Sequence, residues 1–289
     1  MGKHGIAVAV DGSAESDAAV RWAASEALLR EADVTLVHVV APVVVTWPVG
    51  YLRASYAEWQ EENAQNVIEQ AQKIFQTEMG DERMPAVKAQ VLHDYVASGL
   101  VAASRDTEMI VAGSRGLGPI SGPLLGSVSR ALLHHARCPV AITHINDTDV
   151  TDRTAPVMVG IDGSPACEAA TAVAFDEASR RNVELVALHA WSDAEITPAL
   201  GMDWHGYEDQ GYEVLAERLA GWQEQYPDVH IRRRIVCDRP ARWLVDESEH
   251  SALVVLGSRG RGGFSGMLLG SVSTAVAEAA KCPVLVVRG

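Results

Sequence analysis

The sequence has few cysteines, and no two of them form a CxxC pair. Only four occur among the 289 residues, at Cys138, Cys167, Cys237 and Cys282. This scarcity excludes a disulfide framework and a cysteine-rich zinc site. It predicts buried free thiols in a reducing compartment, with a regulatory disulfide as the alternative.

Long apolar runs are absent as well. No stretch reaches the ~18 apolar residues that a membrane-spanning helix needs. The first residues, Met1 to His4, lead directly into an apolar segment without the basic and apolar regions of a secretory signal. We therefore expect a cytoplasmic protein with no membrane partner.

Basic residues are in deficit. The chain carries 24 lysines and arginines against 38 aspartates and glutamates, which gives a formal net charge of −14. Because a surface this acidic repels the phosphate backbone, we expect no nucleic-acid partner. A local anion site built from backbone N–H groups needs no net positive charge and is not excluded.

Several common motifs of enzymes are missing. The chain has no G-x-x-x-x-G-K-[ST] and no G-x-S-x-G, which argues against a P-loop NTPase and against a triad hydrolase. No His, Cys and Glu cluster has the spacing of metal ligands. The segment Asp11-Gly12-Ser13 that follows the first apolar run is not the dinucleotide fingerprint G-x-G-x-x-G.

The chain does contain an internal repeat. Val8 to Ser13 recurs as Val159 to Ser164, and Val111 to Ser129 recurs as Val255 to Ser273 with 14 of 19 positions identical. The spacing falls from 151 to 144 residues, so the copies differ by seven residues in the middle of the repeat. A period this long indicates a duplicated domain. We expect domains at residues 1–146 and 155–289, joined by the polar linker Asn146 to Thr154.

Each copy predicts the same alternation of five strands and the helices between them. Such alternation favours a mostly parallel sheet covered on both faces, hence an α/β fold of two tandem open five-stranded domains. The long middle helix is expected over residues 56–78 and 207–225. The strands are expected at 6–10, 34–40, 87–93, 109–112 and 140–144, and at 157–161, 184–190, 231–237, 253–256 and 284–288.

The glycine-rich segment after the fourth strand carries the most information. Gly113-Ser-Arg-Gly116 is followed after nine residues by Gly126-Ser127-Val-Ser129, and the second copy repeats this spacing from Gly257 to Ser273. Glycines let the backbone approach a ligand closely, and free N–H groups at the start of the next helix favour an anion. The pattern predicts a phosphate site in each copy. The alternative is that these glycines only form tight turns.

This pattern, with an aspartate at the end of the first strand, resembles the universal stress protein family over nearly the whole chain. The likeness is to its tandem two-domain type, typical of actinobacteria, mycobacteria included. It implies a Rossmann-like parallel sheet of strand order 3-2-1-4-5 in each copy. It also implies the ATP-binding branch of the family, because members that lack the glycine pattern generally do not bind ATP.

The resemblance also implies the role of individual residues. Asp11 and Asp162 would lie near the ribose and the metal-bound phosphates, and Val39 and Ala190 would contact adenine through backbone atoms. The remaining expected binding residues are Gly113, Arg115, Gly116, Gly126, Ser127 and Val128 in the first copy, and Gly160, Gly257, Arg259, Gly260, Gly270, Ser271 and Val272 in the second.

These residues predict an ATP-binding regulatory protein of the stress response, with one adenine nucleotide per copy and Mg²⁺ brought by the phosphates. A slow ATPase or another nucleotide-dependent enzyme is the alternative, although neither copy offers an evident general base. A third hypothesis is a pure scaffold protein whose nucleotide sites are vestigial. The fifth strand would be an open sheet edge, so we expect the two copies to pair along it and the chain to form a homodimer.

The two copies differ in ways that bear on binding. Arg261 stands where the first copy has Leu117, and it adds a possible phosphate contact. Gly160 stands where the first copy has Ala9. Both differences favour tighter binding in the second copy. His38 and His189 end the second strands, where we expect buried imidazoles with satisfied hydrogen bonds.

Overall fold

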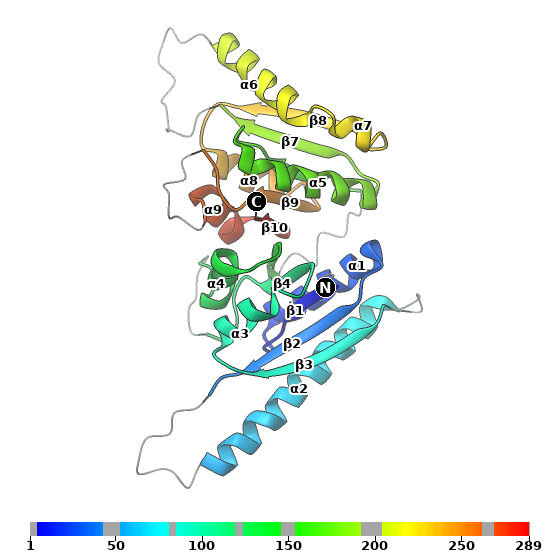
Figure 1. The fold of residues 1–289 in the computed structure, drawn as a ribbon, viewed down its shortest axis with the longest axis vertical. Coiled ribbons are helices and arrows are strands. Elements are labelled where there is room, and N and C mark those ends of the chain that lie inside the picture. The colour runs from blue at the N-terminus through cyan, green and yellow to red at the C-terminus, as the bar shows by residue number, and fades with distance from the viewer. Residues whose placement is uncertain are drawn as a thin grey trace. The chain divides into compact units, whose positions relative to one another are not determined.

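The computed structural model describes residues 5–42, 53–80, 85–118, 124–145, 154–191, 204–261 and 269–288. Most of the expected linker, residues 146–153, lies outside this part of the chain. The molecule divides into two compact units, Met1–Thr148 and Asp149–Gly289. Figure 1 shows that each unit is a twisted sheet with helices on both faces.

The first unit has five parallel strands. They are β1 (Ile6–Ala9), β2 (Val34–Val40), β3 (Val87–His93), β4 (Met109–Gly113) and β5 (Val140–Thr143), in the spatial order β3-β2-β1-β4-β5. The expected fold class and strand order are confirmed. β1 and β4 are adjacent although two other strands lie between them in the sequence, so the direction of winding changes between them. At such a point the carboxyl ends of the strands leave a crevice.

In the described part of this unit, four helices cover the sheet. α1 (Ala14–Arg30) packs against α2 (Arg53–Met79) on one face, and α3 (Val96–Ala103) packs against α4 (Ser127–His135) on the other. α1 turns a row of small side chains to the sheet, which allows close packing over β4. That row consists of the fully buried Ala18, Ala19, Ala23, Ala24 and Ala27.

The second unit repeats the plan with β6 (Val157–Gly160), β7 (Leu185–Ala190), β8 (Ile231–Val236), β9 (Leu253–Gly257) and β10 (Val284–Val287), ordered β8-β7-β6-β9-β10 and parallel. The helices α5 (Glu168–Arg181), α6 (Trp204–Leu219) and α7 (Trp222–Gln225) follow β6 and β7. The helices α8 (Pro240–Ser248) and α9 (Ser271–Ala279) follow β8 and β9.

One expectation on the helices is wrong. The helix expected over 207–225 ends at Leu219, and a short helix α7 begins at Trp222. The break falls at Gly221, whose φ of 80° is incompatible with a right-handed helix. In this arrangement Trp222 stacks on Phe175 of α5 with ring centroids 5.7 Å apart. Among the described residues, no helix is long and apolar enough to cross a membrane.

Candidate functional site

The first strand of each unit ends in a turn that positions an aspartate. Asp11 and Asp162 each precede a glycine in the left-handed region, with φ of 84° at Gly12 and 82° at Gly163. In both turns the carboxylate accepts a hydrogen bond, at 2.9 Å, from the backbone N–H two residues later. This bond fixes the carboxylate at the carboxyl end of the sheet.

The same carboxylates also hold the glycine-rich loop. The second oxygen of Asp11 accepts the backbone N–H of Leu117 at 3.1 Å, and that of Asp162 accepts the N–H of Arg261 at 2.6 Å. Gly116 and Gly260 pass directly beside these oxygens, so an added Cβ would overlap with the carboxylate. Glycine is therefore required at positions 116 and 260, because any larger residue would displace the aspartate.

The helix that follows the loop begins with unpaired donors. Gly126 caps α4 and donates its N–H to the Ser114 carbonyl at 2.8 Å, and the first intrahelical bond comes from Arg130 to Gly126. In the described part of the chain, the N–H groups of the first three helical residues have no protein acceptor. They belong to Ser127, Val128 and Ser129.

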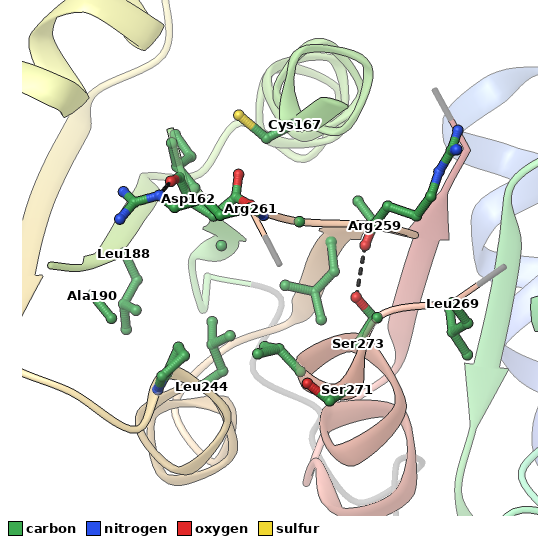
Figure 2. A pocket seen from close by; sticks show the side chains of 18 residues that line it. Asp162, Cys167, Leu188, Ala190, Leu244, Arg259, Arg261, Leu269, Ser271 and Ser273 are labelled. Atoms are coloured by element: carbon green, nitrogen blue, oxygen red, sulfur yellow. Dashed lines mark hydrogen bonds between the residues drawn. The ribbon is translucent and has the colours of Figure 1, made fainter. Parts of the chain in front are cut away.

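α9 begins in the same way. Gly270 donates to the Ser258 carbonyl at 2.8 Å, and Thr274 makes the first intrahelical bond to Gly270. The Ser273 hydroxyl donates to the Gly257 carbonyl at 2.7 Å, which ties the helix to the end of β9 (Figure 2). The equivalent bond in the first unit joins Ser129 and the Gly113 carbonyl, also at 2.7 Å.

A cavity lies at this end of each sheet. In the first unit it has a volume of about 500 Å³ and is bounded by the ends of β1, β2 and β4 and by the starts of α3 and α4. All eight site residues expected there line it. They are Asp11, Val39, Gly113, Arg115, Gly116, Gly126, Ser127 and Val128.

The second cavity is smaller, about 180 Å³, and Figure 2 shows the side chains around it. All nine site residues expected in this unit line it, which are Gly160, Asp162, Ala190, Gly257, Arg259, Gly260, Gly270, Ser271 and Val272. The sequence pattern thus selects residues that the fold brings together from four separate segments.

The model of the universal stress protein family matches residues 4–144 and 154–288. The chain belongs to this family. It is 54% identical to a universal stress protein of Mycolicibacterium smegmatis and 50% identical to one of Mycobacterium tuberculosis, in each case over 99% of this chain and 97% of the relative. A solved universal stress protein from Archaeoglobus fulgidus has the same fold, with a TM-score of 0.69 at 21% identity, over 98% of this chain and 97% of that one.

The glycines expected at the two sites are not all there to make room for a ligand. A Cβ at Gly113 would lie 2.7 Å from the backbone carbon of Glu15, and one at Gly160 would lie 2.6 Å from the Leu256 side chain. These two glycines allow close packing within the protein. At Gly126 and Gly270 the φ angles are −63° and −76°, and a Cβ would meet no atom closer than 3.4 Å. The protein itself does not require glycine at these two positions.

The two arginines of the pattern line the cavities, one in each unit. The guanidinium of Arg115 pairs with Glu15 of α1 at 3.3 Å. Figure 2 shows the side chain of Arg259 directed away from the cavity, on the side opposite Asp162.

In each of the two histidines, Nδ1 is bonded to a backbone carbonyl at the end of the first strand. Nδ1 of His38 lies 2.8 Å from the Val10 carbonyl, and Nδ1 of His189 lies 2.6 Å from the Ile161 carbonyl. Burial lowers the pKa of His189, and the nearby Arg261 lowers it further, against the opposing effects of the Ile161 carbonyl and Asp162. His189 is therefore neutral near pH 7, with the proton on Nδ1.

Sequence reasoning missed the apolar wall of the cavities. Leu100 of α3 lines the first cavity, and Leu244 of α8 lines the second. Both side chains are buried, and they are equivalent residues of the two copies, 144 positions apart in the sequence. Cys167 and Leu269 also line the second cavity. The sequence did contain a signal for this pair, because Leu100 and Leu244 are separated by the same 144 residues as the two glycine-rich segments.

Proposed function

We propose that each unit binds one adenine nucleotide, with ATP as the ligand, and that the chain is an ATP-binding regulator of the stress response. The nucleotide-binding domains would span residues 1–146 and 155–289. One observation carries the proposal. At the start of α4 and again at the start of α9, three N–H groups without an acceptor among the described residues border a cavity at the crevice of the sheet. The helix dipole makes that end favourable for phosphate oxygens.

The opposite side of each cavity suits a base. Val39 lies next to the last residue of β2, and Leu188 and Ala190 line the other cavity from β7. Apolar side chains next to exposed strand-end backbone groups can bury the adenine ring and read its edge. The aspartate lines the same cavity, and we propose that it contacts the ribose.

A magnesium ion fits this site only together with the phosphates. Among the described residues, no three His, Cys, Asp or Glu side chains gather as metal ligands. Asp11 or Asp162 could supply one carboxylate, directly or through water. Mg²⁺ keeps several waters and is usually held by one or two carboxylates and substrate phosphates, which agrees with such a site.

A slow ATPase is the second candidate, and rate measurement separates the two. The carboxylates nearest the cavity already accept backbone N–H bonds that hold the turn and the glycine-rich loop, so each has a structural role. A turnover above roughly 1 s⁻¹ is in the usual enzyme range and would favour catalysis. Turnover slower than one per hour would favour a binding role.

Native mass spectrometry tests the proposal directly. The protein as purified, and after nucleotide removal and addition of Mg-ATP, should carry up to two adenine nucleotides per chain. Calorimetry of the nucleotide-free protein should give the same stoichiometry, with GTP as the comparison. Absence of both co-purified nucleotide and binding heat would contradict the proposal.

Two further parts of the proposal concern the setting of the protein. All four cysteines are free thiols, which agrees with a reducing compartment, and we place the protein in the cytoplasm. We also propose a homodimer, in line with the family resemblance. Light scattering should then give twice 30.9 kDa, and a monomeric mass at working concentrations would contradict this part alone.

A further inference from the structure

Arg261 makes the two cavities chemically different. It occupies the position that Leu117 has in the first unit, 144 residues earlier. Its Nε donates to the Asp162 carbonyl, and its Nη2 lies 3.1 Å from Nε2 of His189. Leu117 is 73% exposed and offers no such bonds.

The guanidinium lies on the strand-end side of the cavity. In Figure 2 it is on the side of Leu188 and Ala190, and away from Ser271 and Ser273. It also passes close to the turn, because a Cβ at Gly163 would be 3.1 Å from Nη2. The phosphate contact expected from the sequence would require a different direction. In this structure Arg261 instead lies where the base is proposed to bind.

His189 is suited to hold this arginine. Its Nδ1 proton goes to the Ile161 carbonyl, so the lone pair of Nε2 can accept an N–H from Arg261. His38 has the equivalent bond to Val10, but within the described residues its Nε2 has no protein partner. His38 borders the first cavity, whereas Arg261 takes the corresponding place around the second.

The cavity volumes agree with this difference. Small-molecule sites usually have ~300 to 1,000 Å³. The first cavity, at about 500 Å³, is within that range, and the second, at about 180 Å³, is below it. The first cavity therefore offers a nucleotide more room than the second, next to which the guanidinium of Arg261 lies.

We propose that Arg261 is a gate that sets the affinity difference between the two sites. The gate is closed when the guanidinium is bonded to His189 and Asp162, and a nucleotide binds the second site only after displacing it. The first site, with Leu117, has no gate and fills first. This inference rests on the proposed nucleotide binding, and it reverses the order of affinity expected from sequence.

The size of the effect follows from the population of the open state. The apparent Kd equals the intrinsic Kd divided by the fraction of molecules in which the arginine is displaced. Two hydrogen bonds from a charged group correspond to a closed state favoured by about tenfold or more. The second site should therefore bind ATP at least about tenfold more weakly than the first.

Exchanging the two residues tests the gate. Calorimetry with Mg-ATP on the nucleotide-free full chain should show two classes of site in the wild type. Arg261→Leu should tighten the weak class about tenfold and merge the two into one class of two sites. Leu117→Arg should weaken the strong class by a similar factor. Position 117 is exposed, so that variant should fold even if Arg261→Leu does not.

Arg242→Leu is the matched control. Arg242 is an exposed arginine of α8 that pairs with Asp246 and lies outside the second cavity. Its loss should leave both affinities unchanged, which separates the gate from a change in net charge. Melting temperatures of all variants would report their folding.

Three outcomes would overturn the gate. Weaker binding in Arg261→Leu would make Arg261 a direct ligand contact. Two affinities that neither exchange alters would show that residues 117 and 261 do not set them. If the wild type binds no nucleotide at all, the proposed function fails together with the gate, which distinguishes that failure from the other two.

Discussion

Oδ2 of Asp11 lies 3.1 Å from the backbone nitrogen of Leu117, a residue 106 positions later in the chain. This bond joins the end of β1 to the glycine-rich loop, and the bond from Arg261 to Asp162 does the same in the second unit. Each aspartate thus has a structural role before any ligand is considered. A carboxylate has about four lone-pair positions, so oxygens that accept one or two N–H bonds can still face a ligand.

Replacing these aspartates should separate the two roles. Asp11→Ala or Asp162→Ala should weaken ATP binding about tenfold or more at its own site, the scale of a hydrogen bond to a charged group. Calorimetry measures the loss, and Asp→Asn, which keeps one acceptor oxygen, is the milder control. A variant that melts earlier but binds ATP normally would limit the aspartate to its structural role.

The glycines that cap α4 and α9 offer a cleaner test of the anion site. The backbone of Gly126 and Gly270 is open to alanine, so Gly→Ala should cost about 1 kcal/mol of stability or less, through the poorer helix cap. The added methyl should nevertheless hinder phosphate approach to the N–H groups. Titration should find about one site remaining in each single variant.

Gly116→Ala provides the contrast to this pair. Its Cβ would overlap with the Asp11 carboxylate, so we expect loss of stability together with loss of binding. If Gly126→Ala and Gly270→Ala both keep two sites of normal affinity, the helix N-termini do not bind the phosphates.

Trp191 provides an optical signal for the second site. It follows Ala190, which lines the cavity, and its backbone N–H donates to the Val236 carbonyl at 3.1 Å. ATP should change its fluorescence emission because a base beside Ala190 alters the surroundings of the indole. Trp191→Phe should lose most of the change. If the full change persists in this variant, the base does not bind next to Ala190.

The buried His189 should make stability depend on pH. Because burial lowers its pKa in the folded state, the unfolded chain takes up a proton below pH ~6.5 that the folded chain does not. The free energy of unfolding should therefore fall as the pH drops below ~6.5, by up to ~1.4 kcal/mol per pH unit from this residue. Denaturant titrations of His189→Asn should show a shallower fall.

Arg261→Leu provides an internal check on this dependence. The positive charge of Arg261 also lowers the pKa of His189, so its removal should reduce the pH dependence without abolishing it. Identical pH profiles for the wild type and His189→Asn would mean that His189 protonates equally in both states.

Much of the fold could be predicted from the sequence because the signals are local or repeated. The ranges expected for β2 and β3 are those observed, since Asp33 precedes β2, Pro42 follows it, Pro85 precedes β3 and Asp94 follows it, and such residues tend to bound strands. The break at Gly221 was missed, because a helical pattern continues across it and a single glycine does not by itself end a helix.

The sequence by itself determined the duplication and the order of strands and helices along the chain, because these follow from pattern and spacing. The residues expected at each cavity came from the family resemblance. Only the tertiary structure decided what each residue does there. Position 116 must be glycine because a Cβ there would overlap with Asp11, and position 113 because a Cβ would overlap with Glu15. Neither partner is near in sequence. The direction of Arg261 depends on His189, 72 residues away, whose free nitrogen lies within hydrogen-bonding distance. Contacts across the fold, which no local pattern encodes, therefore set the difference between the two cavities.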